Sequence, residues 1–246
     1  MRTSIIENIK AIYRETAIAA KGSNGDNNGT EWFSTNSKGW PHVIVGPASL
    51  NNIDEITQLI EQDKLPPFWL IVPDEAQPNL LEQYGYREVN RWEGMWLNES
   101  NFQAISRTGN SLNIVEANTL QLVDDFWSVV HAALLPNKII HPRVFNHWIE
   151  SKHFILLTGY QNKQPVAAAL AYFNGNVAGL YFIATLPQHQ RKGLASILVS
   201  TIIEKCFVLG ASEIVLHASL AGQKMYENLG FKNSGQISTF WKIGKF

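Results

Sequence analysis

The positions of apolar residues along the chain predict alternating helices and strands. In residues 4–20, Ile5, Ile9, Ile12 and Tyr13 recur at helical spacing, whereas short apolar runs bounded by Gly, Pro or Asn are typical of strands. The predicted strands are residues 42–45, 68–72, 92–97, 112–115, 154–160, 166–173, 177–184, 213–217 and 237–243, and the predicted helices are 4–20, 49–64, 80–84, 119–134, 142–151, 194–209 and 223–229. This order predicts an α/β (α+β) fold with a mixed central sheet flanked by helices.

Two polar segments divide the chain into three predicted parts. Residues 22–30 consist almost wholly of Gly, Asn, Ser and Asp, and we expect them to form a flexible connector. Residues 98–110 form a second polar stretch, where we place a domain boundary. The predicted parts are an N-terminal helix and flexible loop at 1–39, a smaller subdomain at 40–100 and a complete domain at 110–246.

A weak internal repeat links the two larger parts. Residues 81–87 and 226–232 each contain a helix end, a glycine, an aromatic residue and a basic residue, and each precedes a predicted strand. The matching order of strands and helices around both segments favours two related halves. Two unrelated helix ends, closed by Gly85 and Gly230, would produce the same local pattern.

Composition limits the expected partners and location. The 246 residues carry a net charge of −1 and are 45% hydrophobic, and no run of five basic residues occurs. Neither nucleic acid nor a membrane surface is therefore an expected partner. Glu7, Lys10 and Arg14 interrupt the N-terminal helix, and no apolar run approaches the ~20 residues that cross a bilayer. A cytoplasmic location is expected.

Cysteine and histidine predict neither a thiol site nor a metal site. Cys206 is the only cysteine and lies in an apolar stretch without an activating base nearby, so we expect a buried, inert thiol. The histidines of the middle region do not show the H-x-x-x-H spacing of a helical zinc site. These histidines are His131, His141, His147 and His153.

The segment 185–196 carries the most informative pattern. A predicted strand ends there, a polar loop follows, and a long apolar helix begins next to Gly193. The first amides of a helix have no intrahelical partner and carry partial positive charge. Gly193 allows a phosphate to approach the backbone, and Arg191 and Lys192 add charge. This pattern predicts a pyrophosphate site, and an ordinary turn with two solvated bases is the alternative. The loop matches neither a P-loop nor G-x-G-x-x-G.

Residues 110–246 resemble the GNAT superfamily of acyl-CoA-dependent N-acetyltransferases. The family's Gln/Arg-x-x-Gly-x-Gly/Ala loop is matched by Gln190, Arg191, Lys192, Gly193, Leu194 and Ala195, after Pro187. Its later Tyr-x-x-x-Gly-Phe is matched by Tyr226, Gly230 and Phe231. Residues 40–98 resemble the C-terminal half of a degenerate second copy. This half-copy lacks the cofactor loop at 46–50, so it is expected not to bind the cofactor.

The resemblance implies acetyl-CoA as cosubstrate and assigns residues to it. The pantetheine arm is expected to pair with the backbone of strand 177–184, and Ser219 stands where the family often has Asn. The residues assigned to cofactor binding are Ile183, Ala184, Thr185, Gln190, Arg191, Lys192, Gly193, Leu194, Ala195, Ser196 and Ser219.

The resemblance also implies that Tyr226 is the general acid that protonates the leaving thiolate. The alternative for Tyr226 is an aromatic core residue. Strand 177–184 lacks the acidic residue that some family members use as a base. His217 and Tyr181 are the remaining candidates for the base, and a hydrogen-bonded sheet histidine is the alternative for His217.

Together these features predict an N-acetyltransferase that transfers an acetyl group to a primary amine by direct attack. The acceptor is a small molecule, a peptide or a protein, and a monomer or a homodimer is expected. In this superfamily the loop between the first two helices usually forms the acceptor pocket. Here that loop is 134–141, and Trp127 and Trp148 are candidate lining residues, with core packing as the alternative for both. The alternative function is a non-catalytic acyl-CoA-binding or sensing module.

Overall fold

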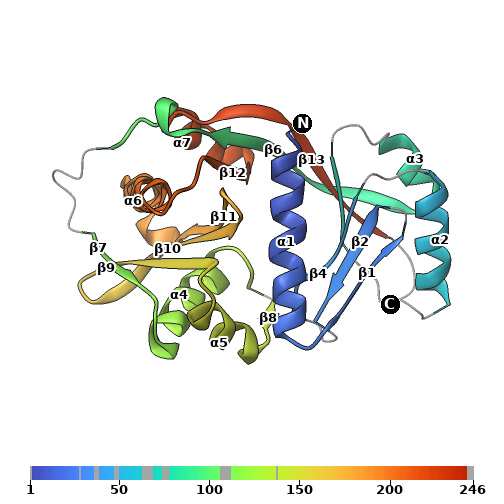
Figure 1. Cartoon of the computed structure of the whole chain (residues 1–246), viewed down its shortest axis with the longest axis horizontal. Coiled ribbons are helices and arrows are strands. Elements are labelled where there is room, and N and C mark those ends of the chain that lie inside the picture. The colour runs from blue at the N-terminus through green and yellow to red at the C-terminus, as the bar shows by residue number, and fades with distance from the viewer. Residues whose placement is uncertain are drawn as a thin grey trace.

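A computed structural model describes residues 2–27, 29–35, 39–46, 50–62, 69–73, 78–105, 112–136 and 138–242 (Figure 1). Residues 47–49 and 106–111, which hold most of the loop expected not to bind the cofactor and part of the predicted domain boundary, lie outside the described residues. The helices are α1 Thr3–Ala19, α2 Leu50–Glu61, α3 Pro78–Gln83, α4 Leu120–Ala133, α5 Pro142–Glu150, α6 Leu194–Val208 and α7 Leu220–Asn228.

Eleven strands of the described residues form one mixed sheet, in the order β1-β2-β4-β5-β13-β6-β12-β11-β10-β9-β7. These strands are β1 Ser23–Asn27, β2 Thr30–Ser34, β4 His42–Val45, β5 Trp69–Pro73, β6 Tyr86–Leu97, β7 Asn113–Glu116, β9 Phe154–Gln161, β10 Gln164–Asn174, β11 Val177–Thr185, β12 Glu213–Ala218 and β13 Lys232–Lys242. Two short strands, β3 Gly39–Trp40 and β8 Ile139–Ile140, form a separate parallel pair. The predicted mixed α/β architecture is confirmed.

The same succession of strands occurs in both halves of the sheet, but it runs across the sheet in opposite directions in the two halves. Strands β4 and β5 are parallel and are joined through α2, just as β11 and β12 are parallel and are joined through α6. The last strand of each half pairs with the other half: β6 is antiparallel to β12, β13 is antiparallel to β5, and β6 and β13 pair at the centre. The two related halves that the sequence repeat predicts thus share one sheet. The residue boundaries between them stay a prediction.

Strands β1 and β2 pair as a β-hairpin, where the sequence predicts a flexible connector. Two glycines of the predicted connector are closely packed: a Cβ on Gly25 would lie 2.1 Å from the Trp32 ring, and one on Gly22 would lie 1.8 Å from the Ser34 carbonyl oxygen. At the turn, Asp26 accepts a hydrogen bond from the Gly29 amide at 2.9 Å. The glycines of residues 22–30 indicate flexibility when that segment is read alone. The contacts that order it come from Trp32 and Ser34, which follow it in the chain.

The helices cover the two faces of the sheet unequally. Helix α1 runs across the middle, between the two halves (Figure 1), and packs with α4 and α5 on one face, which we call the α1 face. Helices α6 and α7 cover the opposite face in the C-terminal half. In the N-terminal half, Ile53 of α2 and Leu81 of α3 pack on that opposite face. Because strand side chains alternate between faces, Leu156 packs on the α1 face and its neighbour Ile155 on the other.

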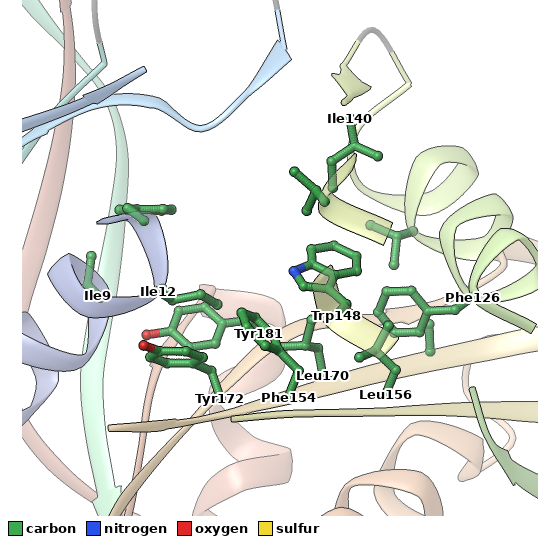
Figure 2. Packing of buried hydrophobic residues seen from close by; sticks show 14 of the residues in the cluster. Ile9, Ile12, Phe126, Ile140, Trp148, Phe154, Leu156, Leu170, Tyr172 and Tyr181 are labelled. Carbon is green, nitrogen blue, oxygen red and sulfur yellow. The ribbon is translucent and has the colours of Figure 1, made fainter. Parts of the chain in front are cut away.

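Tyrosines link α1 to the centre of the sheet. Tyr172 and Tyr181 direct their hydroxyls toward α1, beside a core that contains Trp148 and Phe154 (Figure 2). Asn8 accepts from the Tyr181 hydroxyl at 2.7 Å and donates to the Val177 carbonyl at 3.2 Å. These bonds satisfy a buried amide and hold α1 in register with the sheet.

No described helix combines the length and apolar character required to cross a membrane.

Gly230 tests the packing that closes α7. Its φ is 98°, and a Cβ there would lie 1.9 Å from the Asn101 carbonyl oxygen, whereas Gly175, at φ 62°, faces open space. Gly175→Ala should cost only the left-handed conformation, about 1–2 kcal/mol, or roughly 2–8 °C in melting temperature. Gly230→Ala should lower the melting temperature at least twice as much, measured by circular dichroism. Equal losses in the two variants would contradict this packing.

Candidate active site

Strands β11 and β12 diverge, and the divergence opens the candidate site. They pair only at Val177 with Glu213, Ala178 with Ile214 and Gly179 with Val215. Beyond Gly179, β11 continues to Thr185 and β12 to Ala218 without further pairing to each other. Among the described strands, none therefore neighbours one edge of β11 over its second half.

A bulge at Phe182 accompanies this divergence. Tyr181 pairs with Leu170 and Ala184 with Ala168, so two residues of β11 oppose the single residue Ala169. Phe182 has φ 51°, a left-handed conformation that is unusual for an aromatic residue. As a result the consecutive residues Tyr181 and Phe182 both pack on the α1 face, which regular alternation would forbid. Backbone strain of this kind often marks a functional position.

The loop after β11 ends at a bare helix start. Gly193 is the N-cap of α6, with φ 77°, and it has no side chain to accept from the first amides of the helix. Arg191 is left-handed too, at φ 59°, and alternating backbone conformations of this kind form anion-binding concavities. Arg191, Lys192 and Gly193 are all exposed. The first turn holds Leu194, Ala195 and Ser196.

Two side chains fasten this loop. Gln190 donates from Nε2 to the Thr185 carbonyl at 3.1 Å, and Lys192 donates from Nζ to the Gln188 carbonyl at 3.0 Å. The Thr185 hydroxyl is buried and has no hydrogen-bond partner among the described residues. Ile183 packs toward α6 and Ala184 toward α1.

Helix α7 carries Tyr226 and begins after Ser219. Ser219 is exposed and caps no amide with its side chain. Tyr226 is buried against the Phe231 ring, 5.6 Å between centroids, and its hydroxyl makes no hydrogen bond within the described part of the chain. Burial raises the pKa of Tyr226 well above its usual value near 10, so the phenol keeps its proton at neutral pH.

His217 faces the α1 face, opposite to Leu216, as the alternation of strand 213–217 predicts. Its ring lies 4.8 Å from that of Trp92 and 5.7 Å from that of Tyr181. Burial lowers the pKa of His217 to about 4, and Nδ1 has no hydrogen-bond partner among described residues. The imidazole is therefore neutral over the physiological range.

Tyr181 and Cys206 are both held in their protonated forms. Burial raises the pKa of Tyr181 well above its usual value, and its hydroxyl is already committed to Asn8. Cys206 is fully buried, and burial raises the pKa of its thiol to about 12. Within the described ranges, no three His, Cys, Asp or Glu side chains gather as a metal site would require.

A pocket of about 360 Å³ opens on the α1 face, beside the divergent strands. Two of its walls touch the site: the Trp40 ring lies 4.8 Å from Phe182, and the Trp92 ring lies 4.8 Å from His217. Loop 134–141 contributes part of the lining, whereas Trp127 and Trp148 pack against Phe182 from the core, each at 6.1 Å. The lining residues are Tyr13, Trp40, His42, Val43, Trp69, Ile71, Asn90, Trp92, Leu134, Leu135, Pro136, Lys138 and Thr239.

The profile of the Acetyltransferase (GNAT) family matches residues 120–231, a little under half of the chain. This range contains β11, the Gly193 helix start and Tyr226. The chain carries a GNAT acetyltransferase domain. No curated protein matches the chain in sequence.

Solved structures share the fold over nearly the whole chain. A GCN5-related N-acetyltransferase from Kribbella flavida is 13% identical, with a TM-score of 0.74, over 97% of this chain and 96% of that one. A protein of unknown function from Staphylococcus epidermidis is 14% identical, with a TM-score of 0.65, over 95% and 97%. A GNAT-family protein described as an acetyltransferase, from Novosphingobium aromaticivorans, is 15% identical, with a TM-score of 0.61, over 95% and 99%. At these identities the likeness shows the fold alone, and it includes the N-terminal half.

The GNAT domain thus confirms the resemblance that the Gln190–Ala195 loop and the Tyr226 motif indicate, and it supports acyl transfer as the general chemistry. The sequence did not indicate three contributors to the site: the bulge at Phe182, the hydrogen bonds of Asn8 to β11, and the tryptophans of the N-terminal half. The high tryptophan content, eight residues, was the only signal for the last of these. Their assembly on one face depends on strand register.

His217 predicts an acid-sensitive stability. In the unfolded chain it binds a proton below pH ~6.5, whereas in the folded GNAT domain its pKa is about 4. The unfolded state therefore holds more protons between pH 6.5 and pH 4, and stability falls as the pH falls through that window. We expect this residue to cost about 1–2 kcal/mol between pH 7 and pH 5, and His217→Phe should lose less. Urea unfolding at both pH values measures this, and equal losses in both proteins would refute the assignment.

Proposed function

We propose that the chain is an N-acetyltransferase that transfers an acetyl group from acetyl-CoA to a primary amine by direct attack. One observation carries the proposal: the second half of β11, which has no pairing partner on one edge among the described strands, is followed after the loop 186–193 by a helix start that no side chain caps. An edge that can accept a strand-like arm and a helix start that can accept phosphates lie in sequence along one path. This is the arrangement that an acyl-CoA requires.

Several described groups fit acyl-CoA along this path. The backbone of Ile183, Ala184 and Thr185 would pair with the pantetheine amides as an added strand does. The buried Thr185 hydroxyl, which lacks a partner among the described residues, would gain one there. The amides of Leu194, Ala195 and Ser196 and the side chains of Arg191 and Lys192 would hold the pyrophosphate. Gln190 holds the loop through its hydrogen bond to the Thr185 carbonyl. Ser219, at the start of α7, would contact the cofactor.

When bound, acetyl-CoA supplies a thioester whose carbonyl carbon the amine attacks. A main-chain N–H in the second half of β11, which contains the left-handed residue Phe182, would stabilise the carbonyl oxygen as it gains negative charge. Tyr226 would donate a proton to the leaving sulfur. A phenol is a weaker acid than a thiol, so this transfer depends on contact and on a dry site, in which a thiolate is disfavoured as well.

The lack of a strong base for deprotonating the amine restricts the acceptor to its neutral form. With a pKa near 4, His217 is too weak a base to take a proton from an alkylammonium ion. We therefore propose that the amine arrives unprotonated and that His217 accepts a hydrogen bond from it. Tyr181 has a structural role only, because its hydroxyl is hydrogen-bonded to Asn8 of α1.

The weakness of His217 as a base also favours a second candidate function, a non-catalytic acyl-CoA-binding or sensing module. Such a module would use the same cleft and helix start without turnover. Thiol release across a panel of amines distinguishes the two functions.

Gly193 tests the pyrophosphate site. Gly193→Val places a β-branched side chain at φ 77° in front of the helix amides, and we expect at least a tenfold loss of CoA affinity by calorimetry. Gly210→Val is the matched control, because Gly210 lies beyond the other end of α6, at φ 92°, in open space. The control should keep wild-type affinity if it folds. Equal affinity in both variants would exclude a phosphate site at this helix start.

Tyr226 tests the proposed acid. Tyr226→Phe keeps the buried ring and removes the proton, so kcat should fall about 10²-fold, a usual size for a lost acid catalyst, whereas the Kd of acetyl-CoA should change less than twofold. Parallel loss of both quantities would make Tyr226 a structural residue. An unchanged kcat would remove it from the mechanism.

A further inference from the structure

The pocket beside the cleft is built mainly by the N-terminal half. Trp69 lies on β5 and Trp92 on β6, and both face α1, with Tyr13 of α1 packed against Trp40 at 5.5 Å. The pairing of β3 with β8 joins Trp40 to Ile140 and so holds loop 134–141 against this half. The half without a predicted cofactor loop thus supplies three tryptophan walls.

Two walls of the pocket adjoin the reacting region. Trp40 contacts Phe182 at the bulge, and Trp92 contacts His217 on β12, each at 4.8 Å. A molecule held between these rings would present one end to the space between β11 and β12. Trp69 lies farther out, on the second strand beyond β6 in the sheet order, so the pocket extends away from the cleft into the N-terminal half.

Charge in the pocket has one sign. Among the described lining residues, no side chain is acidic, and Lys138 is the only Lys or Arg. Its Nζ lies 5.5 Å from the centroid of the Trp69 ring, and it forms no ion pair with any carboxylate in the described ranges. A half-buried ammonium without a counter-ion favours an anionic ligand, and it disfavours a second cation at the same ring.

We propose that this pocket binds a small molecule with a flat apolar body and an anionic group, such as an aromatic amino acid. The tryptophans would hold the flat body, since aromatic rings bury large apolar areas in defined geometries, and Lys138 would pair with the anion. The volume, 360 Å³, falls in the range of small-molecule sites.

Under the proposed function, on which this step rests, the molecule is the acetyl acceptor and its amine points to His217. The amine nitrogen bonds to the acyl carbon, the carbon–sulfur bond breaks, and sulfur keeps the electron pair. Tyr226 gives its proton to sulfur, the nitrogen of the forming amide loses one proton to solvent, and solvent returns a proton to Tyr226, so the step balances. The products are CoA and an N-acetylated anion.

A binding experiment tests the pocket without any turnover. The probe is 3-(indol-3-yl)propionate, which has the ring and the carboxylate but no amine, and its amide is the uncharged counterpart. Calorimetry should show at least tenfold tighter binding of the acid to the wild-type chain, and Lys138→Met should reduce that ratio below threefold. Lys152→Met, an exposed lysine on the turn before β9, should keep the wild-type ratio. Equal affinities for acid and amide in the wild type would overturn the proposal.

A turnover experiment then separates the two proposals. With acetyl-CoA present, tryptophan and phenylalanine should exceed their amides and 1,5-diaminopentane at least tenfold in kcat/KM, by thiol release. A preference for the diamine would overturn the inferred acceptor class. Selective binding of the indole acid without turnover of any amine would refute the acetyltransferase but support the pocket. Turnover of other amines without binding of the acid would refute the pocket alone.

Discussion

The limited pairing between β11 and β12 is the constraint on which the rest of the site depends. Two parallel strands that stayed in register would satisfy each other's backbone and leave no room for a ligand. Here the pairing stops after Gly179, and the Phe182 bulge turns β11 so that two consecutive aromatic side chains face α1. The same strand ends at Thr185, whose carbonyl accepts from Gln190 of the loop before α6, so the strand end and the helix-start loop are tied together. An unpaired strand edge and an aromatic contact to the pocket thus accompany one departure from regular pairing.

The exchange of last strands explains why the two halves act together. Because β6 pairs with β12 and β13 pairs with β5, neither half can leave the sheet without breaking a central ladder. Helix α1 adds to this by packing along both halves on one face. The N-terminal half is therefore placed rigidly next to the cleft, close enough for Trp92 to touch His217. A degenerate copy can in this way supply binding surface without keeping a cofactor loop.

Burial sets the proton chemistry of the site in a consistent direction. It raises the pKa of Tyr226 and Tyr181 and lowers the pKa of His217, so each group is neutral at physiological pH. A site of neutral groups disfavours charge in its interior, which suits a neutral amine and a leaving sulfur that must be protonated. Lys138 lies at the outer part of the pocket, where a charged group of a ligand can remain partly solvated.

The sequence by itself determined the local elements and the family. Helical and alternating spacing predicted all seven described α-helices and nine of the thirteen described strands, missing β1, β2, β3 and β8. The short motifs around Gly193 and Tyr226 carried the resemblance, because backbone geometry at a helix start depends on neighbouring residues. Tertiary structure alone decided the rest. The 23–34 hairpin depends on glycines packed under Trp32 and Ser34, the position of β6 between β12 and β13 depends on strands far apart in the chain, and the tryptophan pocket depends on which face each strand presents. Register between distant strands is set by the packing of the whole sheet, and single-chain periodicity carries no record of it.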